Sequence, residues 1–235
     1  MWDGMFEAFS GAHYAALAAA ALVLLGIAAG RRALRSPRAD KAFRKGLAAI
    51  LLLCEVSLQL SYVFEGSWWA GSLPFQLCSL TLLLSALLLL TGWKSLLPVI
   101  VFLGTLGALQ ALLTPNLDET FPQFRYFQFF IAHIGIMATA VYAVAVRQYR
   151  PTLRSTAEAW IWLHILAVPA AIVNGLTGTT NFMFLARKPS TASLLDVLAP
   201  WPWYLLQLEL VAIAMFLLLY GGLKWLDKKT RRRSQ

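Results

Sequence analysis

Long apolar stretches separated by short polar segments recur along the whole chain. A helix that crosses a bilayer needs about 20 mostly apolar residues. Windows of this kind predict seven spans, at residues 12–30, 46–64, 73–91, 95–113, 126–146, 157–176 and 202–223. The pattern therefore predicts an all-α polytopic membrane protein in which residues 1–235 form a single domain, one bundle of seven transmembrane helices.

The composition excludes an ordinary soluble domain. Hydrophobic residues make up 59% of the chain and charged residues 13%, and the mean hydropathy is +0.66. A soluble domain of this size could not bury so much apolar surface in one core. The segments between the apolar stretches are also too short to hold a separate soluble domain.

The basic residues predict the orientation of the bundle. Seventeen of the 20 Lys and Arg residues lie between alternate spans or in the C-terminal tail, and the other three are Arg125, Arg187 and Lys188. The positive-inside rule then places the N-terminus outside and the C-terminus in the cytoplasm. This role accounts for the formal net charge of +9, so no nucleic-acid partner is expected. Because Asp3 and Glu7 come first and a basic cluster follows the first span, we expect that span to be retained as a helix rather than cleaved as a signal peptide.

Polar side chains within the predicted spans converge on the outer half of the bilayer. Such residues are costly in hydrocarbon and usually face a bundle interior or a wet cavity. At about 1.5 Å of rise per residue, the predicted topology gives a similar depth near the outer face to Gln59, Gln76, Cys78, Gln110, Gln128, His133, Asn174, Gln207 and Glu209, with Glu55 somewhat deeper. This one-sided distribution favours an outward-facing pocket over a pathway through the membrane.

Cys78 and His133 are the candidates for chemistry in this pocket. They lie at one predicted depth on different helices, and an imidazole that accepts a thiol proton activates the sulfur as a nucleophile. Glu209 could orient that imidazole through its other nitrogen, an arrangement suited to acyl transfer through a thioester. The alternative is packing, because a buried cysteine is often a small hydrophobe and a lone intramembrane histidine is often a hydrogen-bonded packing residue.

Metal and cofactor chemistry have little support in the sequence. The set Cys78, His133 and Glu209 is a weak metal signal, because its mixed ligands would come from three helices. HExxH, Walker, GxGxxG and CxxC motifs do not occur in the sequence. We therefore expect no metal site and no cofactor.

The sequence also predicts the state of the two cysteines and the position of Pro74. Cys54 and Cys78 differ in predicted depth by roughly 10 Å, which is beyond disulfide reach, so both are expected to be free thiols. Pro74 is expected in the first turn of the third helix, where its missing N–H is harmless.

Three stretches of the sequence together resemble a known family. They are LPFQLCSL at the start of the third span, FIAHIG in the fifth, and TTNFMFLARKPSTASLLDVLAPWPWYLLQLE leading into the seventh. They resemble the YwaF-like bacterial integral membrane proteins, and the likeness extends from about residue 73 to residue 209. The last stretch is the most specific, because the residues in register with the family pattern include Asn181, Lys188, Pro189, Pro200, Trp201, Pro202, Trp203 and Tyr204.

The resemblance implies a lipid substrate and a covalent mechanism. The YwaF-like family is similar to a eukaryotic transmembrane phospholipid acyltransferase, which implies a nucleophile at Cys78 and a general base at His133. It also implies a multi-pass protein of the bacterial inner membrane. The chain departs from the family pattern at Gln76, where the family often has histidine; glutamine can hydrogen-bond an oxyanion but cannot take a proton near neutral pH. It departs again at Phe182, Phe184 and Ala199, where the family favours two tyrosines and a glycine.

These observations predict a lipid acyltransferase or acyl hydrolase that acts on phospholipid in the outer leaflet. Gln76, Asn174 or Asn181 could donate to the oxyanion, and Gln59 and Gln110 could contact substrate in the same pocket. Arg125, Arg187 and Lys188 are placed to hold a lipid phosphate; the alternative is that each only extends its charged end to the membrane interface. The alternative is a seven-helix binding or transport protein for a lipid or a small polar solute, without covalent chemistry. The sequence leaves the oligomeric state open.

Overall fold

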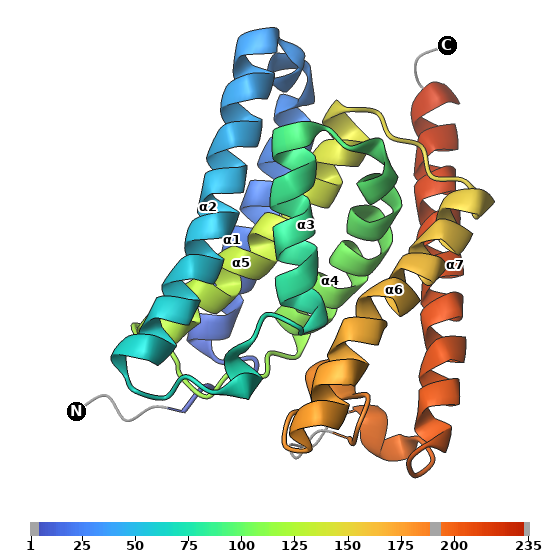
Figure 1. Cartoon of the computed structure of the whole chain (residues 1–235). Helices are drawn as coiled ribbons and strands as arrows, with labels where there is room; N and C mark the ends of the chain where they lie inside the picture. Colours follow the sequence, from blue (N-terminus) through green and yellow to red (C-terminus); the bar gives the residue numbers. More distant parts are fainter. Residues whose placement is uncertain (1–4, 189–193, 233–235) are drawn as a thin grey trace. The chain divides into compact units, whose positions relative to one another are not determined.

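The computed structural model describes residues 5–188 and 194–232 of the chain. It divides into two compact units, which are treated separately below. Unit 1 consists of Met1–Trp68 and Cys78–Tyr149, and unit 2 of Trp69–Leu77 and Arg150–Gln235. Figure 1 shows that the regular structure drawn is helical, and the described residues contain no strand beyond one isolated bridge between Met5 and Glu119.

Within the described residues the α-helices are α1 (Gly11–Ala29), α2 (Pro37–Phe64), α3 (Leu77–Thr91), α4 (Thr105–Leu113), α5 (Phe124–Val141), α6 (Leu153–Thr177) and α7 (Trp203–Arg232). Short 3₁₀ turns are η1 (Gly30–Arg35), η2 (Ala70–Ser72), η3 (Lys94–Leu96), η6 (Phe182–Phe184) and η7 (Leu194–Val197). Two π-helical segments, η4 (Val99–Gly104) and η5 (Tyr142–Val146), adjoin α4 and α5.

Each predicted span coincides with a helical segment, and the chain is an all-helical, multi-pass membrane protein. Among the described residues, six segments are long and apolar enough to cross a bilayer: Gly11–Arg35, Pro37–Phe64, Lys94–Leu113, Phe124–Val146, Leu153–Thr177 and Trp203–Lys229. The remaining apolar helix, α3, is shorter, with 15 residues. The seventh span and the orientation of the termini therefore remain predictions.

The start of α3 differs from the expectation. Pro74 does not lie in the first turn of the helix, because α3 begins at Leu77. The reason is local: the Phe75 N–H donates to the Leu73 carbonyl at 2.9 Å and closes a tight turn around the proline. Cys78 is consequently the second residue of the helix.

Helix α5 lies at the centre of unit 1. It packs on α1, α2 and α4, and its buried side chains join those of α1 to α4 in one cluster that includes Leu51, Leu82, Ala108 and Ile136. A Cβ built on Gly135 would lie 2.7 Å from Leu51 Cδ2, so this glycine allows α2 and α5 to approach closely.

His13 fixes the first helix of unit 1, a role that the sequence did not reveal. Its side chain is fully buried, and its Nε2 donates to the Leu112 carbonyl at the end of α4 at 2.7 Å. Its Nδ1 accepts from the Phe9 N–H at 2.8 Å. Because both ring nitrogens are used, this histidine is a structural residue.

Unit 2 contains the α6 and α7 pair and the loop between them. The first turn of α6 is closed by Thr152, whose hydroxyl accepts from the Ser155 N–H at 3.2 Å. The helix ends at Gly178, whose φ of 65° is the left-handed conformation that glycine adopts most easily. Helix α7 is the longest, with 30 residues.

Candidate functional site

Cys78 lies in the first turn of α3 and is half-buried. Residues three, four and seven positions apart share one helix face, so Cys78 lies on the same face as Leu82 and Ser85, which are both buried. No hydrogen bond reaches the Cys78 sulfur from any described residue, His133 included. Cys54, on α2, is buried, and the prediction that both cysteines are free thiols is confirmed.

His133 is buried in α5, with 7% of its surface exposed. Its Nδ1 lies 2.7 Å from the Phe129 carbonyl oxygen one turn earlier, and its ring lies 4.2 Å from the Phe129 ring. A carbonyl oxygen can only accept, so Nδ1 carries the proton of the neutral ring. This leaves Nε2 with the lone pair, the form that a general base requires.

Cys78 and His133 both lie beside one buried cluster of unit 1. Figure 1 shows that α3 and α5 run in the same direction. Leu82 is four residues after Cys78, Ile136 is three residues after His133, and both belong to the cluster around α5. Ala132, directly before His133, belongs to it as well. Cys78 therefore lies about one turn before the cluster on α3, and His133 lies among the cluster residues of α5.

A polar network surrounds the same end of α2 and α5. The Gln59 amide donates to the buried Glu55 carboxylate at 3.1 Å, and the Trp68 indole donates to Gln59 Oε1 at 3.3 Å. Beside them, Arg125 donates to Gln128 Oε1 at 2.5 Å, and the Gln128 amide donates to the Cys54 carbonyl at 3.3 Å. Of the predicted substrate-binding residues, Gln59 and Arg125 are therefore held in place within unit 1.

Gln110 has a local role in α4. It is exposed, and its amide donates to the Thr114 hydroxyl at 2.8 Å, one turn along the chain. This contact closes the end of α4, and the predicted contact of Gln110 with substrate remains a prediction.

Asn174 fastens the loop that follows α6 in unit 2. Its Oδ1 accepts from the Phe182 N–H at 2.8 Å and from the Thr180 hydroxyl at 2.9 Å, while its Nδ2 donates to the Phe182 carbonyl at 3.0 Å. Asn174 and Phe182 are both buried. These contacts give Asn174 a structural role, and its role as an oxyanion donor remains a prediction.

Asn181 closes the next turn of the same loop. Its Oδ1 accepts from the backbone N–H groups of Ala186 and Arg187 at 3.2 and 3.0 Å, and its Nδ2 donates to the Arg187 carbonyl at 2.8 Å. The Arg187 side chain returns to the Thr179 carbonyl at 2.7 Å. Gln76 also contacts this loop, because its Oε1 accepts from the Met183 N–H at 3.0 Å.

The PWPWY part of the family motif packs against this loop. Tyr204 is fully buried and its hydroxyl donates to the Phe184 carbonyl. Trp201 donates to the Leu185 carbonyl at 3.3 Å, and Lys188 donates to the Leu198 carbonyl at 2.6 Å. The motif therefore builds a folded cap between α6 and α7. Pro189, also in the motif, lies outside the described residues.

Glu209 contacts α6. Its Oε2 accepts from the Trp160 indole at 2.8 Å, and its Oε1 lies 3.3 Å from His164 Nε2. His164 Nδ1 is 2.9 Å from the Trp160 carbonyl, so both ring nitrogens of His164 face oxygen acceptors. The orientation of His133 by Glu209 remains a prediction. No role was predicted for His164, and its spacing of four residues from Trp160 was the available signal.

No set of three or more His, Cys, Asp or Glu residues in the described ranges is arranged to hold a metal ion. The polar residues fall instead into three groups: the α2 and α5 network beside His133, the loop fastened by Asn174 and Asn181, and the Glu209 contacts between α6 and α7. The first group is the one that shares α5 with the candidate imidazole.

Comparison with known proteins assigns the family. No curated protein and no solved structure matches the chain. A family model described as the TMEM164 family matches residues 8–220, which include the half-buried Cys78, the buried His133 and the folded cap around Tyr204. A match over this much of the 235 residues establishes membership, and the chain belongs to the TMEM164 family of transmembrane proteins.

Proposed function

We propose that the protein is an integral membrane lipid acyltransferase or acyl hydrolase, with Cys78 as the nucleophile and His133 as the general base. The observation that carries this proposal is the placement of the two residues on the buried faces of α3 and α5 beside a shared cluster: Cys78 is one turn before Leu82, and His133 lies between Ala132 and Ile136. The likeness of the sequence to the YwaF-like proteins and their acyltransferase relative supports the same pair. The substrate is phospholipid in the outer leaflet of the bacterial inner membrane, and no cofactor is required.

The reaction begins at the Cys78 sulfur. His133 Nε2 takes the thiol proton, and the thiolate attacks the carbonyl carbon of a phospholipid ester. As the oxyanion collapses, the ester C–O bond breaks, and His133 returns the proton to the leaving lysolipid oxygen. Cys78 then holds the acyl group as a thioester.

The second half of the reaction restores the enzyme. A hydroxyl of an acceptor lipid, or water, attacks the thioester while His133 takes its proton. The C–S bond breaks, and the thiolate recovers the proton from His133. An acceptor lipid gives acyl transfer and water gives hydrolysis. Two features favour this chemistry: the tautomer of His133, which leaves Nε2 able to accept, and the position of Cys78 in the first turn of α3, where unpaired N–H groups and the helix dipole stabilise a thiolate.

The other predicted residues serve binding. Gln76 uses its Oε1 for the Met183 N–H, so its amide NH₂ group is left to donate to an oxyanion. Arg125, Arg187 and Lys188 provide the positive charge for a lipid phosphate on the outer side. A non-covalent lipid or solute binding protein is the competing function, in which the same pocket would bind without transferring an acyl group.

Turnover of a fluorescent-acyl phospholipid separates the two functions. The purified protein in detergent–lipid micelles is incubated with the substrate, with and without a lysolipid acceptor, and products are separated by chromatography. We expect acyl transfer or release in the wild type, a loss of at least about 100-fold in Cys78→Ala, and no loss in Cys54→Ala. Wild-type protein that binds the lipid but never transfers or releases the acyl chain, across several head groups and acceptors, would favour the binding protein.

A further inference from the structure

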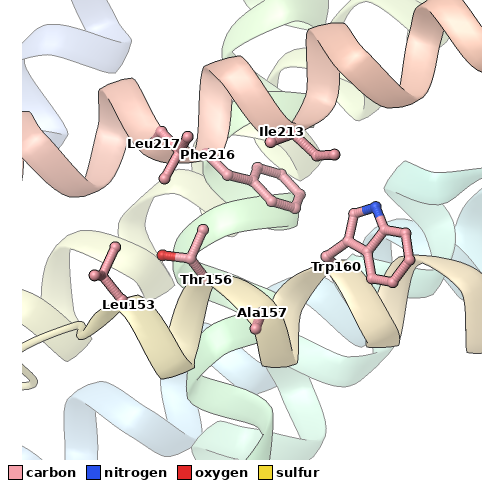
Figure 2. Close-up of a pocket in the computed structure, with 7 residues that line it drawn as sticks. All are labelled: Leu153, Thr156, Ala157, Trp160, Ile213, Phe216 and Leu217. Atoms are coloured by element: carbon pink, nitrogen blue, oxygen red, sulfur yellow. The ribbon is translucent and has the colours of Figure 1, made fainter.

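An apolar hollow of about 270 Å³ lies between α6 and α7 within unit 2. Figure 2 shows α6 and α7 facing each other across it, with Phe216 directed from α7 toward α6. Its lining residues are Leu153, Thr156, Ala157, Trp160, Ile213, Phe216 and Leu217. Thr156 and Phe216 are buried, whereas the other lining residues are exposed at the surface of a membrane protein. The hollow is therefore a surface groove with apolar walls.

A second hollow, of about 260 Å³, continues along the same two helices and has charged residues in its lining. It is lined by Arg150, Pro151, Thr152, Tyr220, Leu223, Lys224 and Asp227. Arg150 donates to Asp227 at 2.6 Å, and the Lys224 ammonium lies 5.5 Å from the centre of the Tyr220 ring. Two cations and one carboxylate leave this end with a net positive charge.

The two hollows follow one face of each helix. On α7 their lining residues recur at the three- and four-residue spacing of a single helix face, from Ile213 to Asp227. On α6 they run from Trp160 back to Leu153, which at about 1.5 Å per residue is about 10 Å, or a third of a hydrocarbon core about 30 Å thick, and they continue into residues 150–152 before the helix. We name this combined surface the α6–α7 groove. Its charged end lies among the basic residues that the positive-inside rule assigns to the cytoplasmic side.

We propose that the α6–α7 groove binds an anionic phospholipid of the cytoplasmic leaflet, with its phosphate beside Lys224 and Arg150 and one acyl chain along the apolar walls. The apolar section supplies the surface that a lipid chain covers, and the cationic section supplies the charge that a phosphate requires. One leaflet contains both parts of such a ligand at the depths that the groove provides. Trp160, hydrogen-bonded to Glu209, ends the apolar section at the deep end.

This site does not depend on the proposed acyl transfer. Its lining residues belong to α6 and α7 and to the segment before α6, and none of them is Cys78 or His133. The expected ligand also comes from the leaflet opposite the proposed substrate. A result that contradicts one proposal therefore does not contradict the other.

Native mass spectrometry of the full chain tests the groove. The protein is titrated with phosphatidylglycerol and, separately, with phosphatidylcholine of the same acyl chains, and retained lipid is counted per protein. We expect a saturable first site that prefers phosphatidylglycerol. Lys224→Gln should weaken that site about fivefold, the effect expected for one cation near an anionic headgroup. Ala157→Phe should weaken binding of both lipids by filling the apolar section at an exposed position.

A matched variant separates binding in the α6–α7 groove from diffuse attraction to the basic tail. Lys228→Gln removes a cation of the same helix one turn further along, outside the set of lining residues, and should leave the first site unchanged. Equal losses from Lys224→Gln and Lys228→Gln would overturn the proposal, because diffuse attraction to the basic tail would then explain the binding. Equal retention of the two lipids, or a dimer that Ala157→Phe dissociates without any change in retained lipid, would also overturn it.

Discussion

The turns around His133 in unit 1 and around His164 in unit 2 have the same local structure. Each histidine directs Nδ1 at the carbonyl of an aromatic residue four positions earlier, at 2.7 Å for His133 and 2.9 Å for His164. Each ring also packs on the side chain of that residue, with centroids 4.2 and 4.3 Å apart. The local sequence pattern therefore produces one arrangement twice, and it does not distinguish a catalytic histidine from a structural one.

The surroundings distinguish them. In the most apolar stretch of the segment that carries His133, 61% of the residues are buried. Among the described residues, no side chain hydrogen-bonds to His133 Nε2. His164 is exposed, and its Nε2 faces the Glu209 carboxylate. A base needs a nitrogen that can accept, so His133 is suited to proton transfer, whereas His164 joins α6 to α7. A buried imidazole whose second nitrogen has no side-chain partner among the described residues therefore distinguishes the candidate base from the structural histidine.

Turnover should fall far more when His133 is replaced than when His164 is replaced. His133→Gln should lower turnover by at least about 100-fold, because general-base catalysis contributes about 10² to 10⁴. His164→Gln should retain turnover within a few-fold. Both variants are assayed with the fluorescent-acyl phospholipid, and helix content by circular dichroism serves as the folding control. Similar losses in both variants would remove the distinction between the two turns.

The next effect concerns the loop of unit 2. Asn174→Ala should lower the free energy of unfolding by about 2 kcal/mol or more, since it leaves the buried Phe182 N–H and carbonyl without their partner. Amide hydrogen exchange should rise in the loop from Thr179 to Lys188 and remain low in α5. Gln110→Ala, at an exposed amide of unit 1, is the control and should change stability by less than about 0.5 kcal/mol. Unchanged exchange in the loop would contradict the structural role of Asn174.

A pair of glycines compares packing in the two units. Gly135→Ala should destabilise the protein by about 1 to 3 kcal/mol, because the new methyl group must displace the buried Leu51. Gly175→Ala, on α6, has nothing within 4 Å of the added Cβ and should be neutral or slightly stabilising. Thermal unfolding midpoints in one detergent measure both. A larger loss from Gly175→Ala would show that α6 packs more closely than α5.

The smallest effect concerns Glu209. Glu209→Gln should keep the hydrogen bond from Trp160, because an amide oxygen also accepts, and it removes only the charge beside His164. A partly exposed ion pair contributes about 0 to 1 kcal/mol, so stability should change by no more than that. The same variant tests whether Glu209 also has a catalytic role. A large loss of turnover at unchanged stability would favour its predicted role in orienting His133.

The sequence was sufficient for the existence of the helices, because hydropathy reports which segments are apolar enough to lie in lipid. It was less informative on helix ends. The α2 helix begins at Pro37, before the predicted start at 46, because a helix can continue past the apolar core where hydropathy no longer marks it. The late start of α3 depends on a backbone turn at Leu73 that composition does not reveal.

Two side chains meet in a membrane only if they lie at the same depth and their helices turn them toward each other. Helix rotation therefore explains why residues at one predicted depth have different partners. Asn174 is directed at its own loop, and Glu209 at α6. His13 could not be recognised from sequence, because its partner Leu112 is 99 residues away and acts through a backbone carbonyl.

Mapping the acyl group on the protein tests whether Cys78 holds it as a thioester. The wild type is incubated with phospholipid in the absence of acceptor, quenched in acid, digested and analysed by mass spectrometry. We expect an acyl adduct on the peptide that contains Cys78, removed by neutral hydroxylamine and lost in His133→Gln. An adduct on Cys54 instead, or turnover by the wild type that persists in Cys78→Ala, would contradict it.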